Sequence, residues 1–232
     1  MKNFSVKVLC EIAIFAAIGF ALDLIQGSLF GNVWANGGSI GIAMVPIFII
    51  SYRRGLVPGI LCGLLLSLVQ MLGGVYVFQG KTFDNEFLKI MGPFFQIMLD
   101  YVLAYTLVGV AGAFSGMYKK ANSFPKKATA IIIGCFVGGT LKFLCHFFSG
   151  GFFWLDGYSK FMGIASDSWA YSFIYNISYC LPCIILSTVI MVLIAKLHPS
   201  FIIEEDINVS DDEETTENND YENNDSEVSI NE

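Results

Sequence analysis

Six long runs of hydrophobic residues, separated by short polar segments, make up most of residues 5–197. The runs cover residues 5–26, 39–52, 56–75, 87–118, 127–153 and 168–197. Their apolar residues would occupy every face of a helix, which is typical of membrane helices. A helix needs about 20 apolar residues to cross a bilayer. The run 39–52 is shorter and contains Pro46, so we expect it to be kinked or partly buried. The pattern predicts an all-α integral membrane protein, a bundle of six transmembrane helices.

Composition supports a membrane protein. The chain is 55% hydrophobic and only 14% charged, whereas soluble domains carry about 25% charged residues. Small residues also recur three or four positions apart, a spacing that lets helices approach closely in lipid. These pairs are Ala13 and Ala17, Gly55 and Gly59, Gly109 and Gly112, and Gly134 and Gly138. The six cysteines lie in apolar runs and are interpreted as packing residues, not a disulfide framework.

Positive charges predict the orientation. Nine Lys and Arg residues fall at the N-terminus, between the second and third runs, between the fourth and fifth, and after the sixth. Only Lys81, Lys89 and Lys160 fall on the other side, and Lys142 lies within the fifth run. The positive-inside rule then places both termini in the cytoplasm of a multi-pass plasma-membrane protein. The first run contains Glu11 and lacks a cleavage motif, so we interpret it as a retained helix, not a signal peptide.

Charge divides the chain into two parts. Residues 1–202 carry 13 Lys and Arg against 7 Asp and Glu, and form the predicted transmembrane, ligand-binding domain. Residues 203–232 carry 13 Asp and Glu and no Lys or Arg, and are predicted to form an acidic, disordered cytoplasmic tail. The body has no basic surface large enough for nucleic acid, so none is expected as a partner.

Polar side chains within the apolar runs mark a candidate site, because a charge at mid-membrane needs a partner or a wet cavity. They fall into three groups: Asp100 and Tyr101; Lys142, His146, Gly150 and Trp154 along one helix stripe; and Tyr171, Tyr175 and Asn176. Together they offer a carboxylate, an imidazole, amide and phenol groups and aromatic faces. That set suits a flat heteroaromatic ligand with a positive charge.

Each candidate also has an ordinary structural alternative. Asp100 and Lys142 can form an internal ion pair, His146 can be a packing residue, Asn176 can join two helices, and Trp34, Trp154 and Tyr171 can be interfacial aromatics. No catalytic or cofactor motif was found, and Cys180 and Cys183 lack a second ligand pair for a metal. We therefore expect no enzyme activity, no cofactor, no catalytic residue and no metal site.

Two segments resemble a known family. Residues 142–154 follow the pattern K-x-x-x-H-x-x-x-G-x-x-x-W, and residues 170–176 follow A-Y-S-x-x-x-N. Both are similar to the ThiT family, the thiamine-specific substrate-binding (S) component of energy-coupling factor (ECF) transporters. Further similarities lie at residues 11–17, 51–56 and 100–101, so the resemblance covers about residues 5–200.

The resemblance implies a function and a set of site residues. It implies that thiamine binds near the outer surface, and that Ala13 and Ala17 dock a transmembrane coupling subunit carrying two cytoplasmic ATPase subunits. The implied thiamine contacts are Trp34 covering the site, Asp100, Tyr101, His146, Gly150, Trp154, Tyr171 and Asn176, with Lys142 nearby. Two positions depart from the family's pattern: Asp100 replaces a Glu, and Leu66 replaces a Trp that forms an aromatic wall.

The residues suit thiamine, a thiazolium cation joined to an aminopyrimidine. Trp154 and a neutral His146 can stack on its rings, and Asp100 can accept from the amino group. Lys142 would repel the cation, so we expect it to pair with Asp100 or to face the pyrimidine end. Two alternatives stay open. One is an S component for another vitamin, and the other is an intramembrane enzyme using Asp100, Lys142 and His146.

Overall fold

The protein is almost entirely helical where its structure is described. A computed structural model describes residues 5–30, 33–34, 37–77, 83, 85–154, 160–165 and 167–203. The predicted acidic tail, apart from Ile203, and parts of all three predicted outer loops, including Lys81 and Tyr158, lie outside these residues. The first three helices are α1 (Val6–Phe30), α2 (Val45–Arg54) and α3 (Leu56–Leu72).

A long helical segment of changing geometry follows, from Glu86 to Lys120. It consists of α4 (Glu86–Ile97), the π-helical turn η1 (Met98–Leu103), α5 (Ala104–Thr106), the 3₁₀ helix η2 (Leu107–Phe114) and α6 (Ser115–Lys120). Next come α7 (Phe124–Phe153), the short antiparallel strands β1 (Lys160–Phe161) and β2 (Ile164–Ala165), α8 (Trp169–Leu197) and the turn η3 (Pro199–Phe201). The β-hairpin was not anticipated from the sequence.

Every predicted apolar run contains helix. Within the described residues, four helical segments are long and apolar enough to cross a membrane: α1, Glu86–Lys120, α7 and α8. The apolar helix α3 is shorter. Of the two expectations for the second run, burial is confirmed and a kink is wrong, because α2 begins only at Val45 and Pro46 lies in its first turn. Proline is tolerated there, since the first backbone N–H groups of a helix have no intrahelical acceptor. Pro46 therefore starts the helix and does not kink it.

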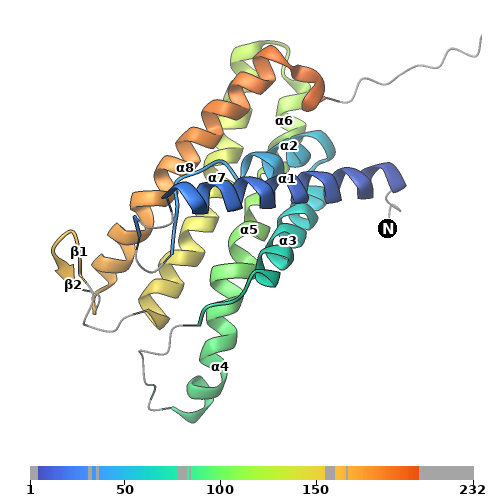
Figure 1. The fold of residues 1–232 in the computed structure, drawn as a ribbon. Coiled ribbons are helices and arrows are strands. Elements are labelled where there is room, and N and C mark those ends of the chain that lie inside the picture. The colour runs from blue at the N-terminus through green and yellow to red at the C-terminus, as the bar shows by residue number, and fades with distance from the viewer. Residues whose placement is uncertain are drawn as a thin grey trace, which may run out of the picture.

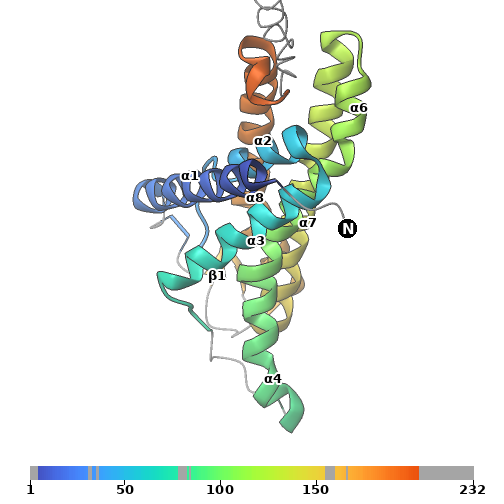
Figure 2. The same cartoon turned by 90° about the vertical axis from the view of Figure 1, so that its right-hand side faces the viewer.

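The helices are arranged with α1 lying across the bundle. In both views α1 runs across the direction of the long segment Glu86–Lys120 (Figures 1 and 2). Helix α6 and the C-terminal end of α8 lie at one end of the molecule, and α4 lies at the other (Figure 1). Residues Val45–Tyr52 of α2 are all buried, so this short helix forms part of the core. The long helices, in contrast to α2, keep large apolar side chains exposed, as helices facing lipid do.

Close packing within the bundle uses three of the four small-residue pairs. A methyl group at Gly109 would collide with the backbone of Gly59, and one at Gly112 with the backbone of Gly55. In α7, Gly134 lies against the Tyr52 hydroxyl. The fourth pair, Ala13 and Ala17, is exposed on α1. Glycine thus lets α3, η2 and α7 touch at backbone distance, whereas the alanine pair of α1 faces outward.

Candidate functional site

A cavity of about 640 Å³ opens among α1, α3, the long segment Glu86–Lys120, α7 and α8. Eight of the nine predicted ligand contacts line it: Asp100, Tyr101, Lys142, His146, Gly150, Trp154, Tyr171 and Asn176. These residues are distant in sequence and come from three different helical segments. The fold therefore brings the separate polar groups of the apolar runs into one place.

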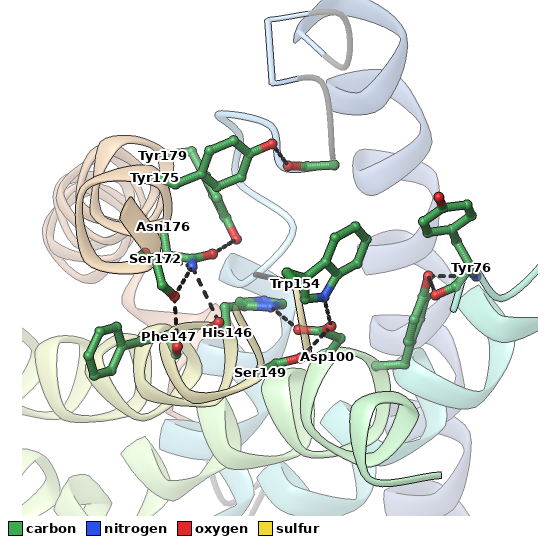
Figure 3. A network of polar contacts seen from close by, with 12 residues as sticks. Tyr76, Asp100, His146, Phe147, Ser149, Trp154, Ser172, Tyr175, Asn176 and Tyr179 are labelled. Atoms are coloured by element: carbon green, nitrogen blue, oxygen red, sulfur yellow. Dashed lines mark hydrogen bonds and ion pairs between the residues drawn. The ribbon is translucent and has the colours of Figure 1, made fainter. Parts of the chain in front are cut away.

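The carboxylate of Asp100 organises one wall of this cavity. Its Oδ1 lies 3.2 Å from His146 Nδ1, and its Oδ2 accepts hydrogen bonds from Ser149 Oγ (2.6 Å) and Trp154 Nε1 (2.9 Å) (Figure 3). We call these four residues the Asp100 network. An ionised carboxylate only accepts, so a neutral His146 carries its proton on Nδ1 and leaves Nε2 as an acceptor. Asp100 thus fixes the orientation of both rings of the α7 stripe.

The local helix geometry presents Asp100 and Tyr101 together. Both lie in the π-helical turn η1, which interrupts the α-helical pattern in the middle of a long helix. Single π-helical turns in longer helices occur frequently at functional sites. The Tyr101 hydroxyl accepts from the backbone N–H of Tyr76 at 2.9 Å, which holds the segment after α3 beside the cavity. The Tyr76 ring then lies 5.6 Å from the Trp154 ring, centroid to centroid.

Asn176 connects α8 to α7 at the opposite wall. Its Nδ2 donates to the His146 carbonyl oxygen (3.2 Å) and to the Ser172 carbonyl oxygen (2.8 Å), while its Oδ1 accepts from the Tyr179 hydroxyl at 2.7 Å (Figure 3). This contact between helices is the structural alternative considered from the sequence. A side chain at Gly150 would collide with Ser172 Oγ, so glycine is needed for this approach of α7 to α8.

Two placements were expected for Lys142: the pairing with Asp100 is wrong, and the position at the pyrimidine end of the ligand stays a prediction. In the part of the chain that the structure describes, Lys142 is not among the partners of Asp100. Instead, Lys142 Nζ lies 3.7 Å from the ring centroid of Tyr105, a cation–π contact. Three other side chains, His146, Ser149 and Trp154, already contact the Asp100 carboxylate, which leaves little room for an ammonium group.

Trp34 does not lie over the cavity, as a residue that covers the ligand would. It is 6% exposed and packs against α8, where its Nε1 donates to Ser178 Oγ at 2.8 Å. Its ring meets Tyr179 edge-on, with 5.8 Å between centroids. Within the described residues, Trp34 does not line the cavity. Its ring packs against Tyr179, and Tyr179 does line the cavity. Leu66, which with Asp100 departs from the family pattern, is fully buried in the core, and Gln70 one turn later faces the cavity.

Sequence reasoning missed several residues of the cavity wall. These are Asp23, Gln26, Gly37, Gly38, Ser39, Gln70, Tyr76, Tyr105, Ser172 and Tyr179, while Tyr175 was noted but not assigned to the site. Asp23 and Gln26 carried a detectable signal, since both are polar residues near the end of the first apolar run. The tyrosines carried none, because aromatic residues are common in membrane helices.

Taken together, the arrangement can bind a flat cation. The rings of Tyr76 and Trp154 present aromatic faces beside a carboxylate. Stacked tyrosines 171 and 175, with centroids 5.5 Å apart, add a second aromatic surface from α8. The Tyr175 hydroxyl donates to the Gly37 carbonyl oxygen at 2.9 Å and so holds the segment after α1 beside the cavity.

Comparison with known proteins agrees with the resemblance noted in the sequence. The family described as Thiamine transporter protein (Thia_YuaJ) matches residues 9–203. A relative named thiamine transporter ThiT from Bacillus subtilis is 30% identical over 197 residues, which cover 84% of this chain and 93% of that protein. The ThiT of Lacticaseibacillus paracasei is 26% identical over 206 residues, covering 86% and 92% of the two chains.

A solved structure gives the same result for the fold. ThiT from Listeria monocytogenes superimposes with a TM-score of 0.66 at 26% identity, covering 85% of this chain and 98% of that one. The family match spans all of the helices except the first three residues of α1, and it includes the entire cavity wall described above. The chain therefore belongs to the thiamine transporter protein family.

Proposed function

We propose that this protein is the thiamine-binding S component of an ECF-type vitamin uptake transporter. It captures thiamine at the outer face of the membrane, and a partner module then drives import with ATP. The family membership and the names of the relatives support thiamine as the ligand and transport as the role. Binding, not catalysis, is the activity that we assign to the cavity.

One observation carries the proposal: Trp154 donates its indole N–H to Asp100 while its ring faces the Tyr76 ring. A thiazolium cation near these rings gains a cation–π attraction of about 2 kcal/mol where the site is desolvated. The adjacent carboxylate adds an attraction for the same positive charge. An uncharged vitamin of similar size would gain neither the cation–π attraction nor the attraction to the carboxylate.

The aminopyrimidine ring requires hydrogen bonds, and the site has matching groups. Asp100 has about four lone-pair directions and uses three, so it can accept one more hydrogen bond from the ligand amino group. A neutral His146 offers Nε2 as an acceptor. The predicted contacts Tyr101, Lys142, Gly150, Tyr171 and Asn176 complete this proposed site, whereas we assign Trp34 an indirect role through Tyr179.

The proposed topology is six membrane helices in a multi-pass plasma-membrane protein, with both termini in the cytoplasm. It rests on the positive charges near α6, the start of α7 and the end of α8. The elements α6 and the end of α8 lie at one end of the molecule, and Lys89 on α4 belongs to the other end (Figure 1). We propose that residues 1–202 form the binding domain and residues 203–232 a cytoplasmic tail.

The proposed partners are a transmembrane coupling subunit and two cytoplasmic ATPase subunits. The exposed position of Ala13 and Ala17 supports α1 as the docking helix, because the other small-residue pairs are used inside the bundle. Small exposed residues four apart leave a shallow groove that another helix can approach.

Fluorescence tests the proposed function directly, since the chain has three tryptophans in different settings. Trp154 lines the cavity, Trp34 is buried against α8, and Trp169 packs among phenylalanines of α7. Micromolar thiamine should quench the emission of the purified protein. Trp154→Phe should remove most of the quenching and Trp169→Phe should preserve it. A response to riboflavin or biotin without one to thiamine would assign the protein to another vitamin.

A further inference from the structure

A second polar cluster lines the cavity apart from the Asp100 network. It consists of Asp23 on α1, Tyr105 on α5 and Lys142 on α7, which we call the Asp23 cluster. The Tyr105 hydroxyl donates to Asp23 Oδ1 at 3.0 Å, and Lys142 Nζ lies 3.7 Å above the centroid of the same ring. One phenol ring thus contacts a carboxylate at its edge and an ammonium group on its face.

This cluster matters for a cavity that receives a cation. Lys142 alone would place a positive charge on the wall and would repel a positively charged ligand. Burial of Tyr105 to 7% exposure excludes most of the water that would screen the charges. Among the described residues of the cavity wall, and with His146 neutral, the titratable side chains are two carboxylates, Asp23 and Asp100, and one ammonium, Lys142, besides the neutral tyrosine phenols. The wall then carries one net negative charge, which matches a single cation.

We propose that Asp23 determines the specificity of this cavity for a cation, by compensating the charge of Lys142 across the Tyr105 ring. The inference rests on the proposed function, because it assumes that thiamine binds here. It assigns a role to a residue of α1 that no sequence motif marked. It also explains how a lysine can belong to the wall of a cation site.

Asp23 also has a structural contact that provides the competing explanation. Gln26 Nε2 donates to Asp23 Oδ1 at 2.8 Å, and Gln26 Oε1 accepts from the backbone N–H of Ala43 at 3.4 Å. Through Gln26, Asp23 contributes to holding the segment before α2 in place. A purely structural role of this kind would affect every ligand of the cavity equally, whatever its charge.

A pair of ligands separates the two roles. We would measure dissociation constants for thiamine and for an uncharged analogue in which a neutral five-membered aromatic ring replaces the thiazolium, at a pH at which a free imidazole is neutral. The quantity of interest is the preference, the dissociation constant of the analogue divided by that of thiamine. Asp23→Asn keeps the size of the side chain and one acceptor oxygen. It should lower the preference roughly tenfold or more.

Lys142→Met should change the preference in the opposite direction, because Asp23 is then uncompensated. In the double variant, Asp23→Asn with Lys142→Met, the preference should return toward the wild-type value. Glu86→Gln is the matched control: it removes an exposed carboxylate that lies outside the cavity wall, so it should leave the preference unchanged. Because Asp23→Asn and Lys142→Met should change the preference in opposite directions, either variant tests the inference even if the other folds poorly.

Two results would overturn the inference. One is an equal loss of affinity for both ligands in Asp23→Asn, and the other is a preference that stays at the wild-type value in both single variants. Failure of the proposed function looks different, because wild-type protein would then bind neither thiamine nor its analogue.

Discussion

At the scale of single residues, Asp100 sets the geometry of the cavity wall. It accepts hydrogen bonds from two rings and one hydroxyl and is only 15% exposed. The carboxylate therefore orients neighbouring side chains in the empty protein, besides any contact that it makes with a ligand. A substitution of Asp100 should therefore change the stability of the empty protein as well as ligand binding.

Trp154→Ala should weaken thiamine binding more than it lowers stability. The variant loses a cation–π contact of about 2 kcal/mol and the burial of the ring against the ligand. We expect a loss of more than roughly 30-fold in affinity, since about 1.4 kcal/mol corresponds to tenfold. A binding isotherm beside a thermal melt of the empty protein measures both effects. An unchanged affinity would show that thiamine does not contact this ring.

Asp100→Asn should lower both the melting temperature of the empty protein and the affinity for thiamine. Asparagine has one acceptor oxygen, so at least one of the three donors of the Asp100 network loses its acceptor, at about 1–3 kcal/mol. Ser149→Ala, which deletes a donor instead, should lower the melting temperature less. If Asp100→Asn melted and bound like the wild type, the Asp100 network would not be the organiser of the wall.

At the scale of elements, the contact between α7 and α8 positions much of the proposed site. Gly150→Ala should shift this contact, because the added methyl group meets Ser172 Oγ and lies 3.1 Å from Asn176 Nδ2. We expect a lower melting temperature together with weaker thiamine binding, measured on the same sample. Gly116→Ala is the control, since a methyl group there meets no atom within 4 Å. Equal behaviour of the two variants would contradict the proposed role of this contact.

The exposed face of α1 gives a prediction about transport instead of binding. Replacing Ala13 and Ala17 together by Trp should abolish thiamine uptake by cells and leave binding to the purified protein intact. Ala16→Trp is the matched control on the same helix, because Ala16 is 1% exposed and its replacement should disrupt the fold and so both activities. Loss of binding in the Ala13 and Ala17 variant would mean that this face is needed for internal packing.

The elements also show what the sequence can and cannot predict. Hydrophobic runs predicted the helices well, because a segment that is apolar on all sides must be buried or face lipid. The π-helical turn at Asp100 and the 3₁₀ helix η2 were not predictable from such runs. In η2, Gly109 approaches the backbone of Gly59, a tertiary contact that hydrophobic runs do not reveal. The start of α2 at Val45 was missed because Pro46 suits both a kink and a first turn.

For the site, sequence predicted the residues of α7 and α8 better than their partners. Helical spacing placed Lys142, His146 and Gly150 on one stripe, and all three line the cavity. The pairing of Lys142 with Tyr105 could not be read from spacing, because it depends on how α5 is turned within a segment of mixed geometry. Trp34 was assigned from resemblance alone, and its place against α8 depends on the path of the chain after α1.

At the scale of the whole molecule, the charges and the fold both support the proposed role as a binding subunit. An apolar bundle encloses a cavity of about 640 Å³ with two carboxylates, one ammonium and several aromatic rings on its wall. The exposed small residues of α1 lie outside this cavity, so the proposed ligand site and the proposed docking face are separate surfaces. The proposed function, a binding subunit that works with a separate energising module, requires this separation.

Calorimetric titration of the detergent-solubilised protein with thiamine tests the central claim most directly. The account predicts saturable heat at micromolar or lower thiamine, with one molecule bound per chain, because the chain contributes one such cavity within its described residues. Absence of heat with thiamine, or saturable heat with riboflavin or biotin in its place, would contradict the account.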